Sequence, residues 1–200
     1  EHQCFMLQMQ LRRLDALDAD IVTLDRQIDE ELEAFADTRE LLNTIPGVDR
    51  VTSATLIAEI GTDMSVFISD AHLASWAGLC PGNNESAGKT KSSRIRLGNI
   101  HLKTALVEAA QSATRARDTY LCDKYHRLKA RRGAKRAWIA IAHKILIAAY
   151  HVLRKREPYR DLGPSFLDQR DQKQSVRNLK RRLERLGYDV YLREAVIPAT

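Results

Sequence analysis

The first forty residues carry an apolar stripe that repeats at the period of a coiled coil. Its members recur every three or four residues with a mean interval of 3.5, and they are Leu7, Leu11, Leu14, Leu17, Ile21, Leu24, Ile28, Leu32 and Phe35. Neither glycine nor proline occurs before Pro46, so no helix breaker interrupts the stripe. The period predicts one long helix over residues 1–40.

An exposed apolar stripe of this length is unfavourable in water, so the helix requires a partner to cover it. Two arrangements satisfy it: a seam between two copies of the chain, or one arm of a helical hairpin within a single copy. We favour the first arrangement. The sequence thus predicts a homodimer or a higher homo-oligomer that assembles through residues 1–40.

The charge of the chain is unevenly distributed. The formal net charge is +6, yet residues 1–40 hold 4 basic and 11 acidic side chains, whereas residues 89–160 hold 19 basic and 4 acidic ones. The second stretch therefore carries a net charge of +15. Such an excess predicts a polyanion, above all a nucleic acid, as the partner, and the alternative is a solvated cationic face.

The remaining composition is typical of a mainly α-helical chain. Aromatic side chains make up only 6% of it, and strong strand patterns are scarce. The longest apolar run, residues 137–152, is interrupted by Lys144 and two histidines and indicates a buried helix, not a membrane span. Cys4, Cys80 and Cys122 are an odd number without paired spacing, which predicts a reducing cytosol and no metal site.

Residues 42–61 resemble a helix-hairpin-helix motif. The turn Pro46-Gly47-Val48 separates two short apolar patterns of helical spacing. In such a motif the free amides of the hairpin and of the second helix bind a nucleic-acid phosphate, which makes Gly47 a candidate contact. Asp49 stands where the motif usually has a second glycine and brings a negative charge close to that phosphate. A purely structural hairpin is therefore the alternative.

Four more helices are predicted from capping residues and from glycine or proline at their ends. Their approximate ranges are 70–76, 99–113, 118–133 and 134–156. The expected N-caps of the first three are Asp70, Asn99 and Asp118. The tail is predicted to hold a basic helix at about 175–186, followed by a short strand-like run at 188–192.

The stretch 78–99 is rich in turn formers and cations and has few apolar side chains to pack. It reads Gly-Leu-Cys-Pro-Gly-Asn-Asn-Glu-Ser-Ala-Gly-Lys-Thr-Lys-Ser-Ser-Arg-Ile-Arg-Leu-Gly-Asn. A hydroxyl nucleophile in a flexible loop among cations suits chemistry on a phosphate. The candidate nucleophile is Ser86, and the alternatives are Ser92, Ser93 or no catalytic serine in this copy.

Two groups of residues are candidates for binding the nucleic-acid backbone. The first group surrounds the candidate serine and consists of Lys89, Lys91, Arg94, Arg96 and the helix start at Asn99. The second group lies in the basic cluster 127–136 and consists of Arg131, Arg132, Lys135 and Arg136. Cations of this kind grip phosphates and neutralise charge that develops on them.

These pieces together resemble the transposases of the insertion sequence 110 and 116 group. The resemblance covers about residues 41–163 and is carried by Ile45-Pro-Gly, Ala58-Glu-Ile-Gly, Trp76-Ala-Gly-Leu-Cys-Pro-Gly, Glu85-Ser-Ala-Gly, Gly98-Asn, Leu106-Val-Glu-Ala-Ala and Glu157-Pro-Tyr-Arg-Asp-Leu-Gly. It implies a serine-type DNA recombinase in which Ser86 matches the family's loop serine. Many members have Ser-Gly where this chain has Ser86-Ala87-Gly88.

The resemblance also implies a division of the chain. Residues 1–40 correspond to a coiled-coil dimerisation helix, residues 41–163 to the transposase domain, and residues 164–200 to a basic tail. A family member further has a RuvC-like domain with acidic ligands for a divalent metal such as Mg²⁺, and it uses a guide RNA to choose its DNA. We expect this chain to be inactive without that domain and to reside in the bacterial cytoplasm at the nucleoid.

Two other functions fit the same residues. The chain is either a non-catalytic helix-hairpin-helix module that binds nucleic acid, with the serine loop as a phosphate clamp, or the remnant of a decayed transposase. A phosphoserine-linked DNA adduct separates catalysis from binding alone.

Overall fold

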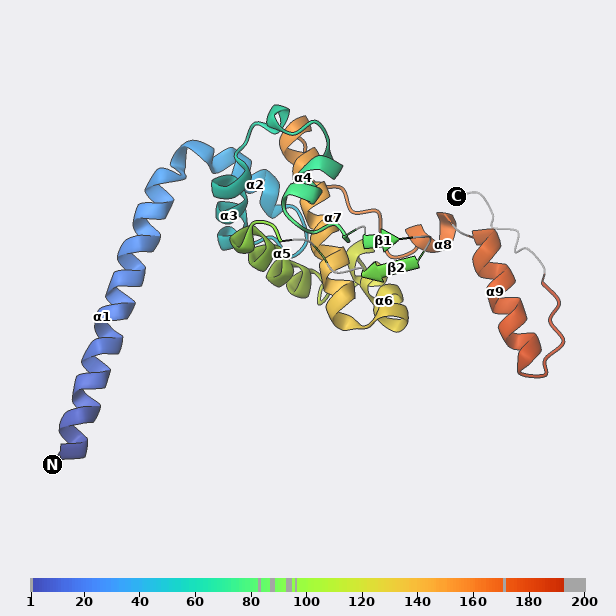
Figure 1. Ribbon diagram of the computed structural model, residues 1–200, viewed down its shortest axis with the longest axis horizontal. Helices are drawn as coiled ribbons and strands as arrows, with labels where there is room; N and C mark the ends of the chain where they lie inside the picture. The colour runs from blue at the N-terminus through green and yellow to red at the C-terminus, as the bar shows by residue number, and fades with distance from the viewer. Residues whose placement is uncertain are drawn as a thin grey trace, which may run out of the picture.

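The structure is a computed structural model that describes residues 2–82, 84–86, 89–92, 95, 97–170 and 172–192. It is mainly helical, as the composition predicts (Figure 1). The described helices are α1 (His2–Glu31), α2 (Ala36–Asn43), α3 (Arg50–Ile60), α4 (Asp70–Trp76), α5 (Ile100–Ala113), α6 (Tyr120–Arg132), α7 (Ala134–Lys155), α8 (Phe166–Arg170) and α9 (Gln172–Arg185). Short 3-10 turns occur at Glu33–Phe35 and Met64–Val66, and the strands are β1 (Asn84–Ser86) and β2 (Lys89–Ser92).

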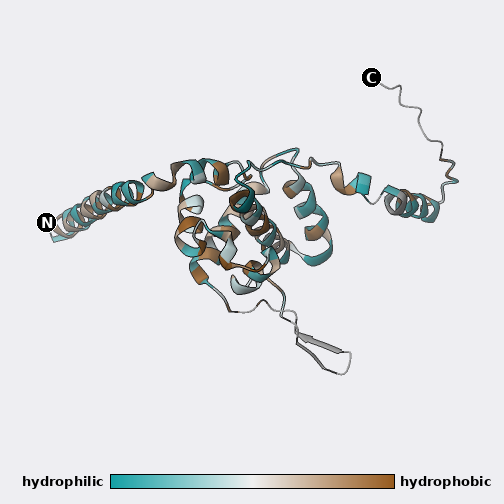
Figure 2. Ribbon diagram, turned by 90° about the horizontal axis from the view of Figure 1, so that it is seen from above, coloured by the Kyte–Doolittle hydropathy of each residue, from teal (hydrophilic) through white to brown (hydrophobic). Residues whose placement is uncertain are grey.

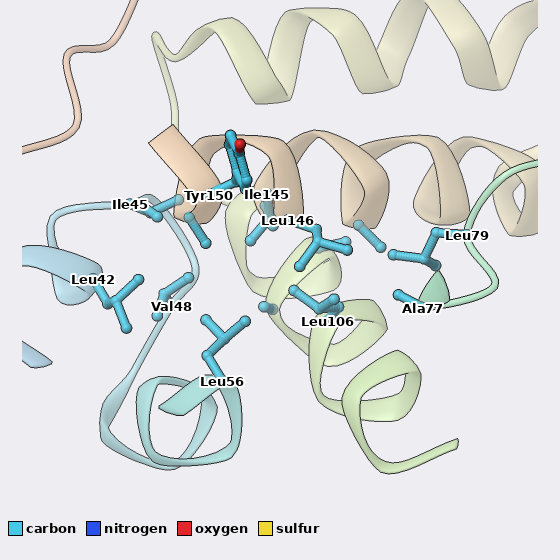
Figure 3. Close-up of a cluster of buried hydrophobic side chains, with 14 of the residues drawn as sticks. Leu42, Ile45, Val48, Leu56, Ala77, Leu79, Leu106, Ile145, Leu146 and Tyr150 are labelled. Carbon is cyan, nitrogen blue, oxygen red and sulfur yellow. The ribbon is translucent and has the colours of Figure 1, made fainter. Parts of the chain in front are cut away.

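Helix α7 is the centre of the core and packs against α2, α4, α5 and α6. Its length and hydropathy would suffice for a membrane span, but its apolar side is covered by these helices, and Ile141, Ile145 and Leu146 are fully buried. Figure 3 shows how Ile145 and Leu146 face leucines of α3 and α5 across the cluster. This agrees with the buried helix predicted for residues 137–152.

Helix α1 projects from the core as a straight arm (Figure 1), and none of its side chains is buried. The helix ends at Glu31, so the prediction of one helix through residue 40 is wrong. The 3-10 turn at Glu33–Phe35 bends the chain because Leu32 turns into the core, where it is 9% exposed. The alternative intrachain hairpin does not form among the described residues.

Ion pairs hold the base of the arm. Asp29, near the end of α1, accepts hydrogen bonds from Arg50 at the start of α3 and, at 3.5 Å, from Arg39 of α2. The direction in which α1 leaves the core is thus tied to the first two helices of that core.

The predicted caps are partly correct. Asn99 caps α5 by accepting a hydrogen bond from the amide of Leu102 at 3.0 Å. The caps of α4 and α6 are instead Ser69 and Thr119, the hydroxyl residues next to the predicted Asp70 and Asp118. Asp118 has a left-handed φ of 58°, which takes it out of the extended conformation that an N-cap residue adopts.

The tail contains the predicted basic helix, α9, which packs on α8 and stands apart from the core (Figure 2). Residues 188–192 form no strand, so this prediction is wrong. The described part of the tail offers this short run no second strand to pair with, and an unpaired strand leaves its backbone groups unsatisfied.

Candidate nucleic-acid site

The serine-bearing stretch forms a two-stranded antiparallel hairpin where its sequence predicts a loop. Strand β1 pairs with β2 through the partners Asn84 and Ser92, Glu85 and Thr90, and Ser86 and Lys89. An isolated bridge between Pro81 and Ile95 extends the pairing toward the core. Among the described residues, strands β1 and β2 pack extensively against each other but not against the helices.

Among the described residues, Ser86 belongs to the strand pair at the turn end of the hairpin. It is the last residue of β1, and its Cα partner is Lys89, the first residue of β2. Ala87 and Gly88 stand between them in the sequence and lie outside the described residues. The backbone therefore places the candidate nucleophile directly opposite a lysine.

The pairing separates the other candidates along the hairpin. The register shifts between Asn84 and Glu85, so Lys91 is an extra residue on β2, as in a β-bulge. Ser92 pairs nearer the base than Ser86 does. Ser93, Arg94 and Arg96 lie outside the described residues, and their predicted roles remain predictions.

The two ends of the hairpin segment meet at a close backbone approach. A Cβ added to Gly98 would lie 2.5 Å from the carbonyl of Ala77 and 2.6 Å from the amide nitrogen of Gly78. Only glycine fits between these backbones without displacing one of them. Two of the sequence pieces that carry the family resemblance thus meet at the base of the hairpin.

Asn99 anchors the same base. Its side-chain oxygen caps α5, and its amide nitrogen donates a hydrogen bond to the carboxylate of Glu59 on α3. Both polar ends of this half-buried side chain therefore have protein partners, which gives Asn99 a structural role in addition to the nucleic-acid contact predicted for it.

Gly47 lies in a packed hairpin between α2 and α3. Its φ is +86°, and an added Cβ would lie 2.2 Å from the carbonyl oxygen of Ala109 and 2.6 Å from the amide of Ala113 on α5. Asp49 caps α3 through the Thr52 amide at 2.8 Å, and this hydrogen bond lowers the pKa of the Asp49 carboxyl below its usual value. Packing on α5 thus explains why residue 47 is a glycine, and capping of α3 explains the aspartate at position 49. Both explanations fit the alternative in which the hairpin is purely structural.

A basic corner, which we define as Arg131, Arg132, Lys135 and Arg136, lies where α6 turns into α7. Gly133, with a φ of +80°, alone connects the two helices. All four side chains are exposed, and none forms an ion pair within the described part of the chain. The first turn of α7 has no acidic residue and no side-chain cap, so the positive end of this helix dipole adds to the field of the corner.

Arg127, at the edge of the same cluster, is neutralised. Its guanidinium pairs with Asp123 at 2.8 Å and with Asp168 at 2.6 Å, and these hydrogen bonds raise its pKa. Asp168 lies 41 residues away in the sequence, so no local pattern predicts that Arg127 differs from the four cations of the basic corner.

The sequence interpretation also missed a cleft beside α7. This cleft has a volume of about 540 Å³ and lies between α7 and residues 157–162. The lysines Lys144 and Lys155 line it together with Arg160. The available signal was the spacing of the two lysines, which are eleven residues apart and so share one face of a helix.

The residues described here do not include a group of three or more His, Cys, Asp or Glu side chains that could hold a metal ion. Cys122, which the sequence places near His126, donates a hydrogen bond to the carbonyl of Thr114 at 3.4 Å.

The hairpin and its glycine-closed base lie within a segment that is similar to a known family. Residues 39–127 match the family described as Transposase IS116/IS110/IS902 family. This part of the chain is thus similar to the transposase domain of that family, in line with the resemblance.

Curated relatives extend the match. The transposase for insertion sequence element IS1111A of Coxiella burnetii is 31% identical over 159 residues, which are 74% of this chain and 43% of the relative. The pilin gene-inverting protein of Moraxella bovis is 33% identical over 145 residues, 70% of this chain and 45% of the relative. The insertion element IS110 uncharacterized 43.6 kDa protein of Streptomyces coelicolor is 32% identical over 150 residues, which are 72% of this chain and 36% of the relative. The chain spans less than half the length of these relatives.

Proposed function

We propose that this chain is the C-terminal part of a transposase and supplies Ser86 as the nucleophile for DNA strand cleavage and exchange. The observation that carries the proposal is the register of the hairpin, which sets Ser86 opposite Lys89 at the turn end of the two strands. The match of residues 39–127 to a transposase family supports DNA as the substrate.

In the proposed reaction the Ser86 hydroxyl oxygen attacks the phosphorus of a DNA phosphodiester. A bond forms between this oxygen and phosphorus, the bond from phosphorus to one sugar oxygen breaks, and the serine proton is transferred so that the freed strand ends in a hydroxyl. The phosphoserine link conserves the bond energy. The hydroxyl of a second strand then attacks the same phosphorus and regenerates Ser86.

Positive charge is needed around the phosphate because negative charge develops on its oxygens during attack. Lys89 and Lys91 on β2 are the proposed source within the described residues, and Arg94 and Arg96 follow them in the sequence. The sequence between Gly82 and Gly98 contains no histidine to serve as a base. We therefore propose that activation comes from a RuvC-like domain that holds divalent metal, on the same or a neighbouring protomer.

Binding is assigned to surfaces beyond the hairpin. The four cations of the basic corner are exposed and without ion-pair partners among the described residues, which suits contacts with a phosphate backbone. In this proposal DNA is bound in the bacterial cytoplasm, a guide RNA selects it, and α1 joins the protomers. Gly47 and Asn99 contribute by holding the hairpin base and the core behind it.

The test traps the covalent intermediate. The full-length protein of the element is incubated with a nicked DNA substrate that cannot complete the exchange, and the products are resolved on a denaturing gel. We expect a protein-linked DNA band that Ser86→Ala abolishes and that Ser92→Ala and Ser93→Ala, the matched controls, retain. A band of normal intensity with Ser86→Ala would refute the assignment.

A second candidate, nucleic-acid binding without catalysis, is favoured by the basic corner, whose four exposed cations have no ion-pair partner among the described residues. It predicts binding that weakens steeply with salt and no covalent adduct under any condition. The same gel separates the two functions, because binding alone leaves no band after denaturation.

A further inference from the structure

Two helices of this chain stand outside the core with exposed apolar stripes. On α1 the stripe includes Leu14, Leu17, Ile21, Leu24 and Ile28, which are 48% to 57% exposed. On α9 it consists of Val176, Leu179 and Leu183, and Leu186 in the turn after the helix continues it; these side chains are 41% to 67% exposed. Figures 1 and 2 show the two helices on opposite sides of the core, so they do not cover each other within one copy.

Both stripes have the spacing of a coiled-coil seam. The intervals along α9 are three, four and three residues, and the intervals from Leu14 along α1 are three, four, three and four. Leu14, Ile21 and Ile28 then occupy the a positions of a heptad on α1, and Val176 and Leu183 occupy them on α9. The positions that flank such a seam, e and g, decide which helices pair.

The flanking positions carry opposite charge on the two helices. On α1 they hold Asp18 and Asp25 at e, and Asp20 and the uncharged Gln27 at g. On α9 they hold Lys180 at e and Arg182 at g. The sign is the same at e and at g within each helix, so attraction between α1 and α9 arises in either relative direction of the two helices.

Self-pairing of either helix is disfavoured by the same charges. Residues 14–31 of α1 hold seven acidic and one basic side chain, and residues 172–185 of α9 hold six basic and one acidic. Two α1 helices would bring carboxylates against carboxylates along the seam, and two α9 helices would bring cations against cations. The lengths also match, since α9 is about 21 Å long and the acidic half of α1 about 27 Å.

We propose that α9 of one copy packs against residues 14–31 of α1 of a second copy. The two copies exchange these contacts reciprocally, which gives a closed dimer with twofold symmetry and two identical acid–base seams. This inference rests on the dimerisation through α1 in the proposed function and names the surface that α1 contacts.

The test measures the dimer dissociation constant of the full 200-residue chain by sedimentation equilibrium. The double variant Lys180→Glu and Arg182→Glu should raise the constant about tenfold, because it removes four ion-pair sites in the dimer. Asp18→Lys and Asp25→Lys on α1 should weaken the dimer likewise. The combination of all four changes should restore it to within about threefold of the wild type.

The matched control is Arg177→Glu with Arg181→Glu, which changes the charge of α9 equally at positions b and f that face away from the seam. We expect this variant to dimerise like the wild type. Equal weakening by the control and by the e and g variant overturns the proposal, because net charge and not the seam would then control association. Circular dichroism shows whether α9 stays helical in each variant.

Different results would refute dimerisation through α1 and the seam between α1 and α9. If Leu24→Asp abolishes the dimer while the α9 variants leave it unchanged, α1 pairs with another α1 and the α9 seam is refuted, whereas dimerisation through α1 stands. A wild-type chain that is monomeric at all concentrations refutes both. Neither result affects the Ser86 adduct, which is measured separately with the full-length protein.

Discussion

The core and the serine hairpin are built on opposite principles. The core is specified by many apolar side chains at helical spacing, and residues such as Leu106, Ile145 and Leu146 have no exposed surface. The hairpin is specified by backbone pairing and by a base at which Gly98 meets Ala77 and Asn99 meets Glu59. A well-packed core therefore fixes the base of the hairpin through close backbone contact and capping, whereas the described strands are held to each other by backbone pairing. Chemistry at the tip can therefore use polar residues that a core does not tolerate.

The largest effect is expected where the core is tightest against backbone. Gly47→Ala places a Cβ 2.2 Å from the Ala109 carbonyl oxygen at a φ of +86°. Overpacking and left-handed strain together should lower the free energy of unfolding by about 4 kcal/mol. Urea denaturation of the full chain measures the change.

Gly61→Ala is the matched control for that change. Gly61 also has a positive φ, +70°, but nothing lies within 4 Å of an added Cβ. Its ψ is −172°, a conformation essentially restricted to glycine, so we expect a loss of about 2 kcal/mol from backbone strain alone. Equal losses in the two variants would mean that close packing of Gly47 on α5 contributes nothing.

The second prediction compares the loss of unfolding free energy caused by truncating a core side chain with the loss caused by truncating a side chain of the α1 arm. Leu146→Ala removes a fully buried side chain of α7 and should cost about 3 kcal/mol of unfolding free energy. Leu24→Ala removes a side chain of α1 that is 57% exposed and should change the stability of the monomer by less than about 0.5 kcal/mol. Thermal unfolding at a concentration below dimer formation compares them, and a large loss for Leu24→Ala would show that the arm packs in the monomer.

A smaller effect on stability is expected at the base of the hairpin. Asn99→Ala removes the cap of α5 and the hydrogen bond to Glu59, at a cost of about 1 kcal/mol. If the base positions the tip, strand exchange by the full-length protein should fall more than this loss of stability explains. Asn99→Asp keeps the cap but replaces the hydrogen bond to Glu59 with repulsion between two carboxylates, so it perturbs this second contact and leaves the first in place. Strand exchange at the wild-type rate in both variants would show that Asn99 does not position the tip of the hairpin.

The smallest effect concerns pH. The hydrogen bond from the Thr52 amide holds the pKa of the Asp49 carboxyl below its value in the unfolded chain. At a pH near these two pKa values the unfolded chain binds more protons than the folded chain, so the free energy of unfolding rises with pH. The contribution of Asp49 is complete above the unfolded pKa and is lost as pH falls through the folded pKa. Between about pH 5 and about pH 3 it should amount to roughly 0.5 kcal/mol, because the carboxylate is mostly exposed. Asp49→Asn should flatten this part of the stability curve in chemical denaturation, and an unchanged slope would contradict the capping role.

Helices with local signals were predictable from the sequence. Asn99 and the apolar spacing after it define α5, and Pro158 marks the region in which α7 ends. The Asp70 and Asp118 caps were misplaced by one residue because Ser69 and Thr119 offer equally suitable oxygens, and only the backbone angles decide between them. The end of α1 at Glu31 was missed because Leu32 and Phe35 continue the stripe, while burial of Leu32 in the core breaks the helix.

The candidate site was predictable in composition but not in geometry. Residues 84–92 are polar and lack the alternation of a half-buried strand, so their pairing has no signal in the pattern. The opposition of Ser86 and Lys89 follows from the register of the hairpin. The neutralisation of Arg127 by Asp168 and the approach of Gly98 to Ala77 depend on residues distant in the sequence, which tertiary packing brings together.

The most direct measurement identifies the amino acid that carries the DNA. Protein-linked DNA from a reaction of the full-length protein is digested with nuclease and protease, and the peptide that retains a nucleotide is sequenced by mass spectrometry. The account predicts that the nucleotide is attached through phosphorus to the oxygen of Ser86. Attachment at Ser92 or Ser93, or the absence of any modified serine in a protein that completes strand exchange, would contradict it.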